Sequence, residues 1–155
     1  MKKEPFIFWT NKSAQYIWLH NENQKIYYYS SKILQIINII FILGLFLLEN
    51  RLLGGTIALF ELLITNIYLF KFIKRGVQHK IAKRQYKIFL NEINQELNLC
   101  IEDLDFFILY KKLEFDKFNK ESPPISQSIL NKFNKKFSVI SNITKIPRKY
   151  NLHDK

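Results

Sequence analysis

The side chains with the clearest chemical potential are polar residues that interrupt two long apolar runs. If both runs are helical, small and polar residues recur every three or four positions and therefore share one face of each helix. In the second run, Asn66 is predicted on a different face from Glu61. The residues that share the face of the first run are Gln35, Asn38, Ile42, Leu45 and Glu49. Those that share the face of the second run are Gly54, Ala58, Glu61, Thr65 and Tyr68.

Two interpretations of these polar residues stay open. In the first, they join the two helices by hydrogen bonds, each contributing about 0.6 to 2 kcal/mol, while small residues permit close packing. In the second, several copies associate and the same side chains line a pore, with Glu61 forming a ring of titratable groups. The polar residues are Gln35, Asn38, Glu61, Thr65 and Asn66, and the small residues are Gly44, Gly54 and Ala58.

No other pattern predicts catalysis, a cofactor or a metal site. Gly54-Gly55 lacks the Gly-Lys-Ser or Gly-Lys-Thr sequence that completes a phosphate-binding loop. Cys100 is the single cysteine and lies on an apolar helical pattern, which favours a core residue over a nucleophile. The histidines are far apart in sequence and not at metal-ligand spacing, so we interpret them as surface residues: His20, His79 and His153. We therefore expect a protein that is not an enzyme.

The two apolar runs, residues 33–49 and 52–73, predict a transmembrane hairpin. Each has close to the roughly 20 residues that a helix needs to cross a hydrocarbon core of about 30 Å. Neither contains proline, and the turn between them, Glu49-Asn50-Arg51, is very short. A hairpin buried in a soluble bundle is the alternative, but 155 residues offer too little other apolar surface to enclose it. The predicted fold class is all-α.

The excess of basic residues, a net charge of +11, predicts the orientation of this hairpin. Lysines precede the first run, and Lys71, Lys74 and Arg75 close the second, whereas the turn holds only Arg51. Since basic residues flank the cytoplasmic side, both termini are expected in the cytoplasm, with these three residues at lipid headgroups. A membrane surface thus accounts for the charge better than nucleic acid does.

Helices are also predicted on both sides of the hairpin. Residues 1–32 should begin irregularly, through about residue 8, and then form a lead-in helix capped by Thr10 or Asn11. Residues 74–121 are predicted to form one long cytoplasmic helix. Residues 122–155 should hold a Pro-Pro break, a short basic helix starting at Ser126, and a tail. The long helix carries a heptad pattern, predicted to be an assembly seam, at Tyr86, Leu90, Ile93, Leu97, Cys100, Leu104 and Phe107.

This arrangement resembles the SLATT superfamily, which comprises bacterial two-transmembrane effectors of nucleotide-signalling and other anti-phage conflict systems. The resemblance covers Trp9 and Ser13-Ala14 near the start, the two spans with their tiny turn, the long helix, and Pro123-Pro124. It implies a protein that oligomerises and permeabilises the inner membrane when a partner sensor is triggered. It supplies no catalytic residue, and no nucleotide-sensing domain follows the helices here.

The leading hypothesis is therefore an oligomeric, pore-forming effector in the inner membrane of a bacterium. Its expected partners are membrane lipid, further copies of itself, and a regulatory or sensor protein encoded nearby. The chief alternative is a passive anchor or scaffold that presents a coiled-coil module to another protein. A third alternative is a phage holin, although the cytoplasmic region would be unusually long for one.

Overall fold

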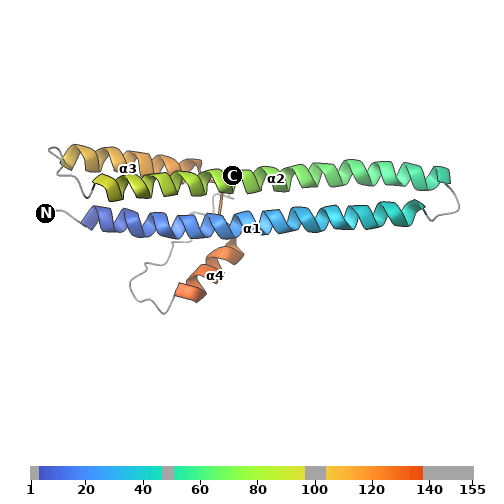
Figure 1. Cartoon of the computed structure of the whole chain (residues 1–155), viewed down its shortest axis with the longest axis horizontal. Helices are drawn as coiled ribbons and strands as arrows, with labels where there is room; N and C mark the ends of the chain where they lie inside the picture. The colour runs from blue at the N-terminus through green and yellow to red at the C-terminus, as the bar shows by residue number, and fades with distance from the viewer. Residues whose placement is uncertain (1–3, 47–50, 97–103, 138–155) are drawn as a thin grey trace. The chain divides into compact units, whose positions relative to one another are not determined.

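The computed structural model describes residues 4–46, 51–96 and 104–137, and this part of the chain contains helices and no strands. The helices are α1 (Glu4–Phe46), α2 (Arg51–Glu96), α3 (Leu104–Glu121) and α4 (Gln127–Phe137), as Figure 1 shows. The predicted all-helical class is confirmed. The described chain divides into two units: the hairpin, residues 24–46 and 51–77, and the helical module, residues 4–23, 78–96 and 104–137.

α1 contains both the lead-in segment and the described part of the first apolar run. Residues 4–8 are helical, so the expected irregular start is wrong for them. Pro5 stands in the first turn, where the N–H that proline lacks would have no intrahelical acceptor. Thr10 and Asn11 lie inside α1, so neither of them caps its start.

Residues 74–121 belong to two helices instead of the single long helix predicted. α2 ends at Glu96 and α3 begins at Leu104, and the seam residues Leu97 and Cys100 lie outside the described residues. The Tyr86 hydroxyl donates a hydrogen bond to Asn119 Oδ1 at 2.6 Å. In one straight helix these two residues would be about 50 Å apart, at about 1.5 Å per residue. α3 therefore returns along α2, which removes Phe89 of α2 and Phe115 of α3 from water.

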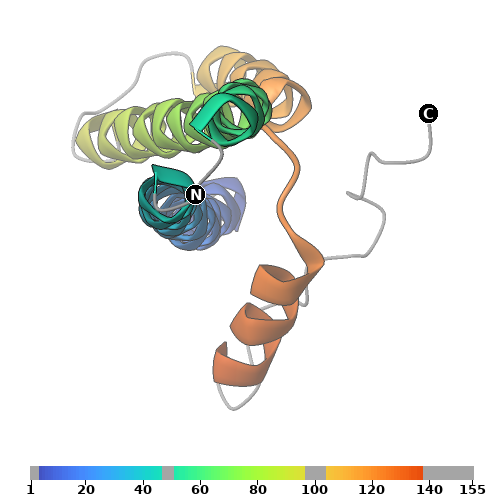
Figure 2. The same ribbon diagram turned by 90° about the vertical axis from the view of Figure 1, so that its right-hand side faces the viewer.

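Aromatic packing holds the helical module together. One cluster joins α1, α2 and α3, and a second joins α4 to α1. α3 packs in the first cluster and α4 packs in the second, and the two helices lie on different sides of the α1 and α2 pair (Figure 2). The first cluster is built from Phe6, Trp9, Tyr86, Phe89, Ile93 and Phe115. The second is built from Leu19, Ile129, Leu130 and Phe133.

The start of α4 is fixed by backbone bonds at Ser126 and by one side chain of α1. The Ser126 carbonyl accepts hydrogen bonds from the N–H groups of Ile129 and Leu130, both at 3.1 Å. The Ser126 N–H donates to Asn23 Oδ1 at 3.2 Å, and Asn23 Nδ2 donates to the Leu19 carbonyl at 2.9 Å. Asn23 thus ties the segment after the two prolines to α1.

Candidate functional site

The polar face of each apolar run lies toward the other helix of the hairpin. In α1 the predicted positions Gln35, Asn38, Ile42 and Leu45 are half-buried. In α2 the predicted positions Gly54 and Thr65 are buried, and Ala58 and Glu61 are half-buried. We call these eight residues the inner stripe. The positions that the i, i+3, i+4 spacing groups on one face are therefore less exposed than the large apolar side chains of the other faces.

The outer surface of the hairpin is apolar. Large side chains on both helices are more than half exposed, with values from 56% to 69%. In water, such a continuous apolar surface would be strongly unfavourable. Both helices of the hairpin belong to segments long and apolar enough to cross a membrane. Representative outer residues are Ile37, Ile40, Leu43, Leu59, Phe60 and Leu63.

Three predicted residues lie away from the inner stripe. Asn66 is exposed, as its placement on a different face from Glu61 requires. Gly44 is also exposed, with nothing within 4 Å of where a Cβ would stand, so it makes no close contact with α2. Tyr68 is 54% exposed because the buried face continues instead through Leu69 and Phe72. A helix of 3.6 residues per turn drifts away from a fixed alternation of three and four.

The inner stripe is a packing contact without direct polar bonds. Thr65 is only 9% exposed. Within residues 24–46 and 51–77, no hydrogen bond joins Gln35 or Asn38 to Glu61 or Thr65. The hydrogen bonds expected across the hairpin are therefore not formed between these side chains. Their donors and acceptors can still bind water or groups of another chain.

The residues predicted at lipid headgroups are all accessible. Lys71, Lys74 and Arg75 are exposed on α2 at the end of its apolar run. The ammonium group of Lys71 lies 5.6 Å from the centre of the Tyr68 ring. A cation and an aromatic ring in contact suit a membrane interface, where the ring sits among headgroups and the charge reaches water.

In the helical module, the predicted surface histidines are a buried pair, which corrects the sequence interpretation for His20 and His79. His20 is fully buried and His79 is 1% exposed. Their Nδ1 atoms are 2.8 Å apart, which is a hydrogen bond between α1 and α2. One ring must donate this proton and the other must accept it, so the bond requires at least one neutral imidazole. His153 lies outside the described residues.

Aromatic rings and a further polar network surround this histidine pair. His20 stacks on Tyr86, with ring centres 5.7 Å apart, and Tyr16 stacks on Tyr86 at 4.9 Å. The Tyr86 hydroxyl, which donates to Asn119, also accepts a long hydrogen bond from Ser122 Oγ at 3.5 Å. The histidine bond thus joins α1 to α2, and the Tyr86 hydroxyl joins α2 to α3 and to Ser122 after it.

This environment keeps His20 uncharged near neutral pH. Burial, with a smaller contribution from the charge of His79, lowers the pKa of His20 from 6.5 to about 3. Its Nε2 atom is buried with no hydrogen-bond partner in the described part of the chain. A proton added there would create a charge that nothing compensates. Acid is therefore expected to destabilise the module at this point.

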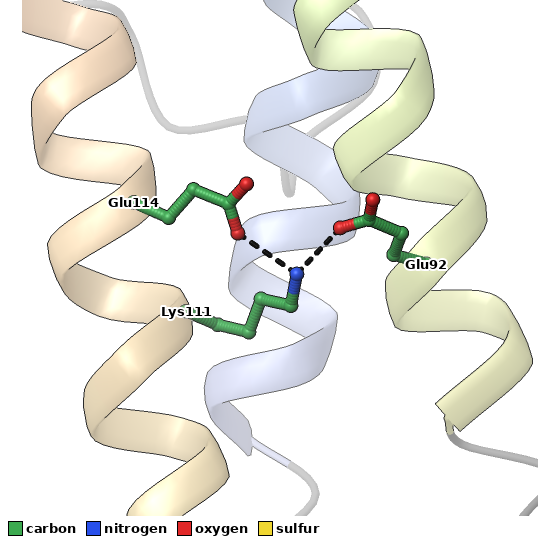
Figure 3. A network of polar contacts seen from close by, with 3 residues as sticks. All are labelled: Glu92, Lys111 and Glu114. Atoms are coloured by element: carbon green, nitrogen blue, oxygen red, sulfur yellow. Dashed lines mark hydrogen bonds and ion pairs between the residues drawn. The ribbon is translucent and has the colours of Figure 1, made fainter.

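A buried lysine joins α3 to α2, as Figure 3 shows. Lys111 is 5% exposed, and its Nζ lies 2.5 Å from Glu92 Oε2 and 2.8 Å from Glu114 Oε2. It also lies over three aromatic rings, at 5.5 to 5.8 Å from their centres. Burial by itself lowers the pKa of Lys111, but the bonds to Glu114 and Glu92 outweigh burial and raise it. Lys111 therefore stays charged and bridges a carboxylate of α2 and a carboxylate of its own helix, α3.

Where the structure describes it, the predicted assembly seam packs against other helices of the same chain. Tyr86 and Ile93 are fully buried, and Leu90 and Phe107 are half-buried. Tyr86 and Ile93 pack against residues of α1 and α3 in the first aromatic cluster. These two residues are therefore unavailable for contact with another copy. Leu104 begins α3, so the seam does not continue along one helix.

The sequence contains a signal for the burial of His79 that lies just before the predicted seam. Continuing the heptad pattern backward from Tyr86 by four and seven residues reaches Ala82 and His79. Both are buried, at 2% and 1% exposure. A histidine at a seam position predicts a buried imidazole that needs a hydrogen-bond partner. The identity of that partner, His20, depends on the packing of α1 and could not be read from the pattern.

The described residues contain no group of three or more His, Cys, Asp or Glu side chains placed to hold a metal ion. Two imidazoles in direct contact leave no space for an ion between their Nδ1 atoms, since zinc alone needs about 2 Å to each nitrogen. No protein-family model, no curated protein and no solved structure matches this chain.

Proposed function

We propose that this protein is an oligomeric membrane protein whose hairpin crosses the inner membrane of a bacterium twice and whose assembled copies permeabilise it when triggered. The observation that carries the proposal is the contrast between the two faces of the hairpin. The outer face exposes side chains such as Ile40 and Phe60, at 63% and 69%, while amides and a carboxyl lie on the inner stripe. A bilayer core suits the first face and a water-filled path suits the second.

The inner stripe supports permeabilisation because it is more polar than a tether requires. Gln35, Asn38 and Glu61 are costly to place in hydrocarbon, where a charged side chain costs about 3 kcal/mol on insertion scales. Among the described residues of the hairpin, no hydrogen bond between these side chains and those of the facing helix offsets this cost. In the proposed assembly, the hairpins associate so that these groups meet water. A nearby sensor protein of the conflict system would control this step through the helical module.

A passive anchor is the second candidate, and one observation favours it. The inner stripe already faces inward in a single chain, which removes its polar groups from lipid without any assembly. In that case the hairpin only holds the helical module at the membrane. Pore formation requires the particular polar side chains of the inner stripe, whereas anchoring does not.

The test compares hairpin variants of the full chain in bacterial membranes, expressed with its genomic neighbours under the condition that triggers the system. The unmodified chain should resist extraction by alkaline carbonate and, once triggered, should collapse the membrane potential and admit a dye. Exchanging the two spans for an unrelated apolar hairpin should retain extraction resistance and abolish depolarisation. Retained depolarisation after the exchange, or an intact potential with the unmodified chain, would reject pore formation.

A further inference from the structure

One polar side chain of the hairpin lies on its outer surface. Asn66 is exposed on α2, among side chains such as Leu63 and Phe70, which are 64% and 69% exposed. Thr56 is also exposed, but it has an interaction within the chain. Asn66 has no hydrogen bond with any residue of the described part of the chain. Its amide can donate and accept hydrogen bonds, and both capacities are unused there.

The depth of Asn66 distinguishes this amide from a polar group at the membrane interface. The apolar run of α2 ends at Ile73, and its first basic residue is Lys71. At about 1.5 Å per residue, Asn66 lies about 7.5 Å along the helix from Lys71 and about 10 Å from Ile73. A lysine stem can carry its charge out to the headgroups, but the short asparagine side chain cannot cover that distance. When α2 crosses a membrane, Asn66 is therefore inside the hydrocarbon core.

Asn66 belongs to a stripe of exposed residues on one side of α2. Gly55 is at one end of this stripe, with nothing within 4 Å of where a Cβ would stand. A glycine beside open space lets a second helix approach closely at that turn. Spacings of four, four, three and four residues keep the members on one side of the helix. We call them the α2 outer stripe: Gly55, Leu59, Leu63, Asn66 and Phe70.

The amide decides what can cover this stripe. Lipid tails have no hydrogen-bonding group, so lipid alone would leave Asn66 with the full cost of an unpaired polar group in hydrocarbon. A second transmembrane helix can supply the partner, since asparagine side chains form hydrogen bonds across helices in membranes. Because an amide both donates and accepts, asparagine is complementary to another asparagine. The stripe is therefore suited to a helix with an amide at the same depth.

We propose that the α2 outer stripe binds the same stripe of a second copy, with hydrogen bonds between the two Asn66 amides. Copies of one sequence insert in the same orientation, because the same basic residues flank the same side. Their α2 helices are then parallel, and the two Asn66 side chains lie at equal depth. A two-fold axis along the membrane normal brings the two amides together. The inference rests on the proposed function, because it requires hairpins that cross the membrane and associate.

The test is disulfide cross-linking of single-cysteine variants of the full chain in native membranes, with the system triggered. In a Cys100→Ser background, Leu63→Cys places the thiol on the α2 outer stripe. Ile64→Cys is the matched control, because Ile64 is the next residue, at nearly the same depth, and is 48% exposed on a different side of α2. A membrane-permeant oxidant should give at least fivefold more dimer from Leu63→Cys than from Ile64→Cys. Equal yields, or no dimer from Leu63→Cys, would overturn the proposal.

The role of the amide is tested in the Leu63→Cys background. Asn66→Leu should lower the dimer yield at least fivefold, whereas Asn66→Gln, which keeps an amide, should retain most of it. Leucine makes the span more apolar, so a loss of dimer with Asn66→Leu cannot come from failed insertion. An unchanged yield with Asn66→Leu, or an equal loss with both variants, would reject the hydrogen bond between copies.

The identity of the partner is tested by expressing two differently tagged copies of Leu63→Cys in one membrane. The cross-linked product should contain both tags at the mass of a dimer. A product that contains one tag and a chain of another mass would identify a different protein on the stripe and reject the second copy.

Extraction and depolarisation separate this inference from the proposed function. A chain that alkaline carbonate extracts from the membrane would reject both. A chain that resists extraction and cross-links at Leu63→Cys without depolarising the membrane would reject only pore formation. Depolarisation without this cross-link would reject only the α2 outer stripe as the contact.

Discussion

The hairpin and the helical module arrange the same kinds of side chain in opposite ways. The hairpin exposes isoleucine, leucine and phenylalanine and turns Asn38 and Thr65 inward, whereas the module buries aromatic residues together with hydrogen bonds between its helices. In the module some buried polar groups bond across helices, as His20 does to His79. In the hairpin the corresponding groups are packed together without such bonds. The difference indicates that polar side chains bond helices to each other in the module, whereas in the hairpin they lie between helices without bonding across them.

The largest predicted effect is on the module core. Tyr86→Ala removes a fully buried ring, its stacking on Tyr16 and His20, and its hydrogen bond to Asn119. We expect a loss of about 4 kcal/mol in the free energy of unfolding, as for other large aromatic truncations. Urea unfolding of the detergent-solubilised chain, followed by tryptophan fluorescence, measures it. Ile88→Ala, at an exposed position, should change the value by less than about 0.5 kcal/mol, and equal losses in both variants would contradict the assignment.

The next largest predicted effect is the loss of folding stability at low pH. Because the pKa of His20 is lowered from 6.5 to about 3, the unfolded chain binds a proton that the folded chain excludes between these pH values. Stability is therefore fully present above about pH 6.5 and falls as the pH drops toward 3. Between pH 7 and pH 4 the loss attributable to His20 should be about 3 kcal/mol.

Comparing unfolding of the unmodified chain and His20→Gln at both pH values isolates this contribution. The variant should be less stable at pH 7 but should lose about 3 kcal/mol less on acidification. If both chains lose the same amount, the histidine pair does not exclude a proton.

A smaller effect is expected at the lysine that joins α3 to α2. Lys111→Ala leaves the carboxylates of Glu92 and Glu114 close together without a cation between them. We expect a loss of about 2 kcal/mol, less than for a fully buried pair because Glu92 is 41% exposed at its side chain. Adding Glu92→Gln should recover part of the loss, since it removes one of the two charges. A double variant less stable than Lys111→Ala would contradict this account.

The smallest effect should be found in the hairpin. Asn38→Leu removes an amide that makes no bond across to α2, so the stability of the hairpin in the membrane should change by less than about 1 kcal/mol. Under the proposed function, the same variant should reduce depolarisation, as should Glu61→Leu. Protease protection of the spans measures the first quantity and a potential-sensitive dye the second. Unchanged depolarisation in both variants would show that Asn38 and Glu61 contribute only to helix packing.

The comparison also explains which features the sequence predicted. The inner stripe followed from spacing, because the face of a helix on which a residue lies is a local property. Burial of Tyr86 and Ile93 followed from the heptad pattern for the same reason. Their partners did not follow, because α3 returns along α2 instead of extending it. His20 and His79 were wrongly predicted at the surface. Their contact joins residues 59 positions apart, which no local pattern reveals.

The long sequence separation of the histidine bond has a consequence for synthesis. The N-terminal part of the module, residues 4–23, is the start of α1, and its partners on α2, α3 and α4 come after both apolar runs. Because the chain emerges from its N-terminus, Trp9 and His20 remain without their native partners until the whole hairpin has been made. Closing so distant a contact is slow compared with forming a helix. The order of events is therefore built into the topology: the apolar segments are complete before the module can fold around its histidine pair.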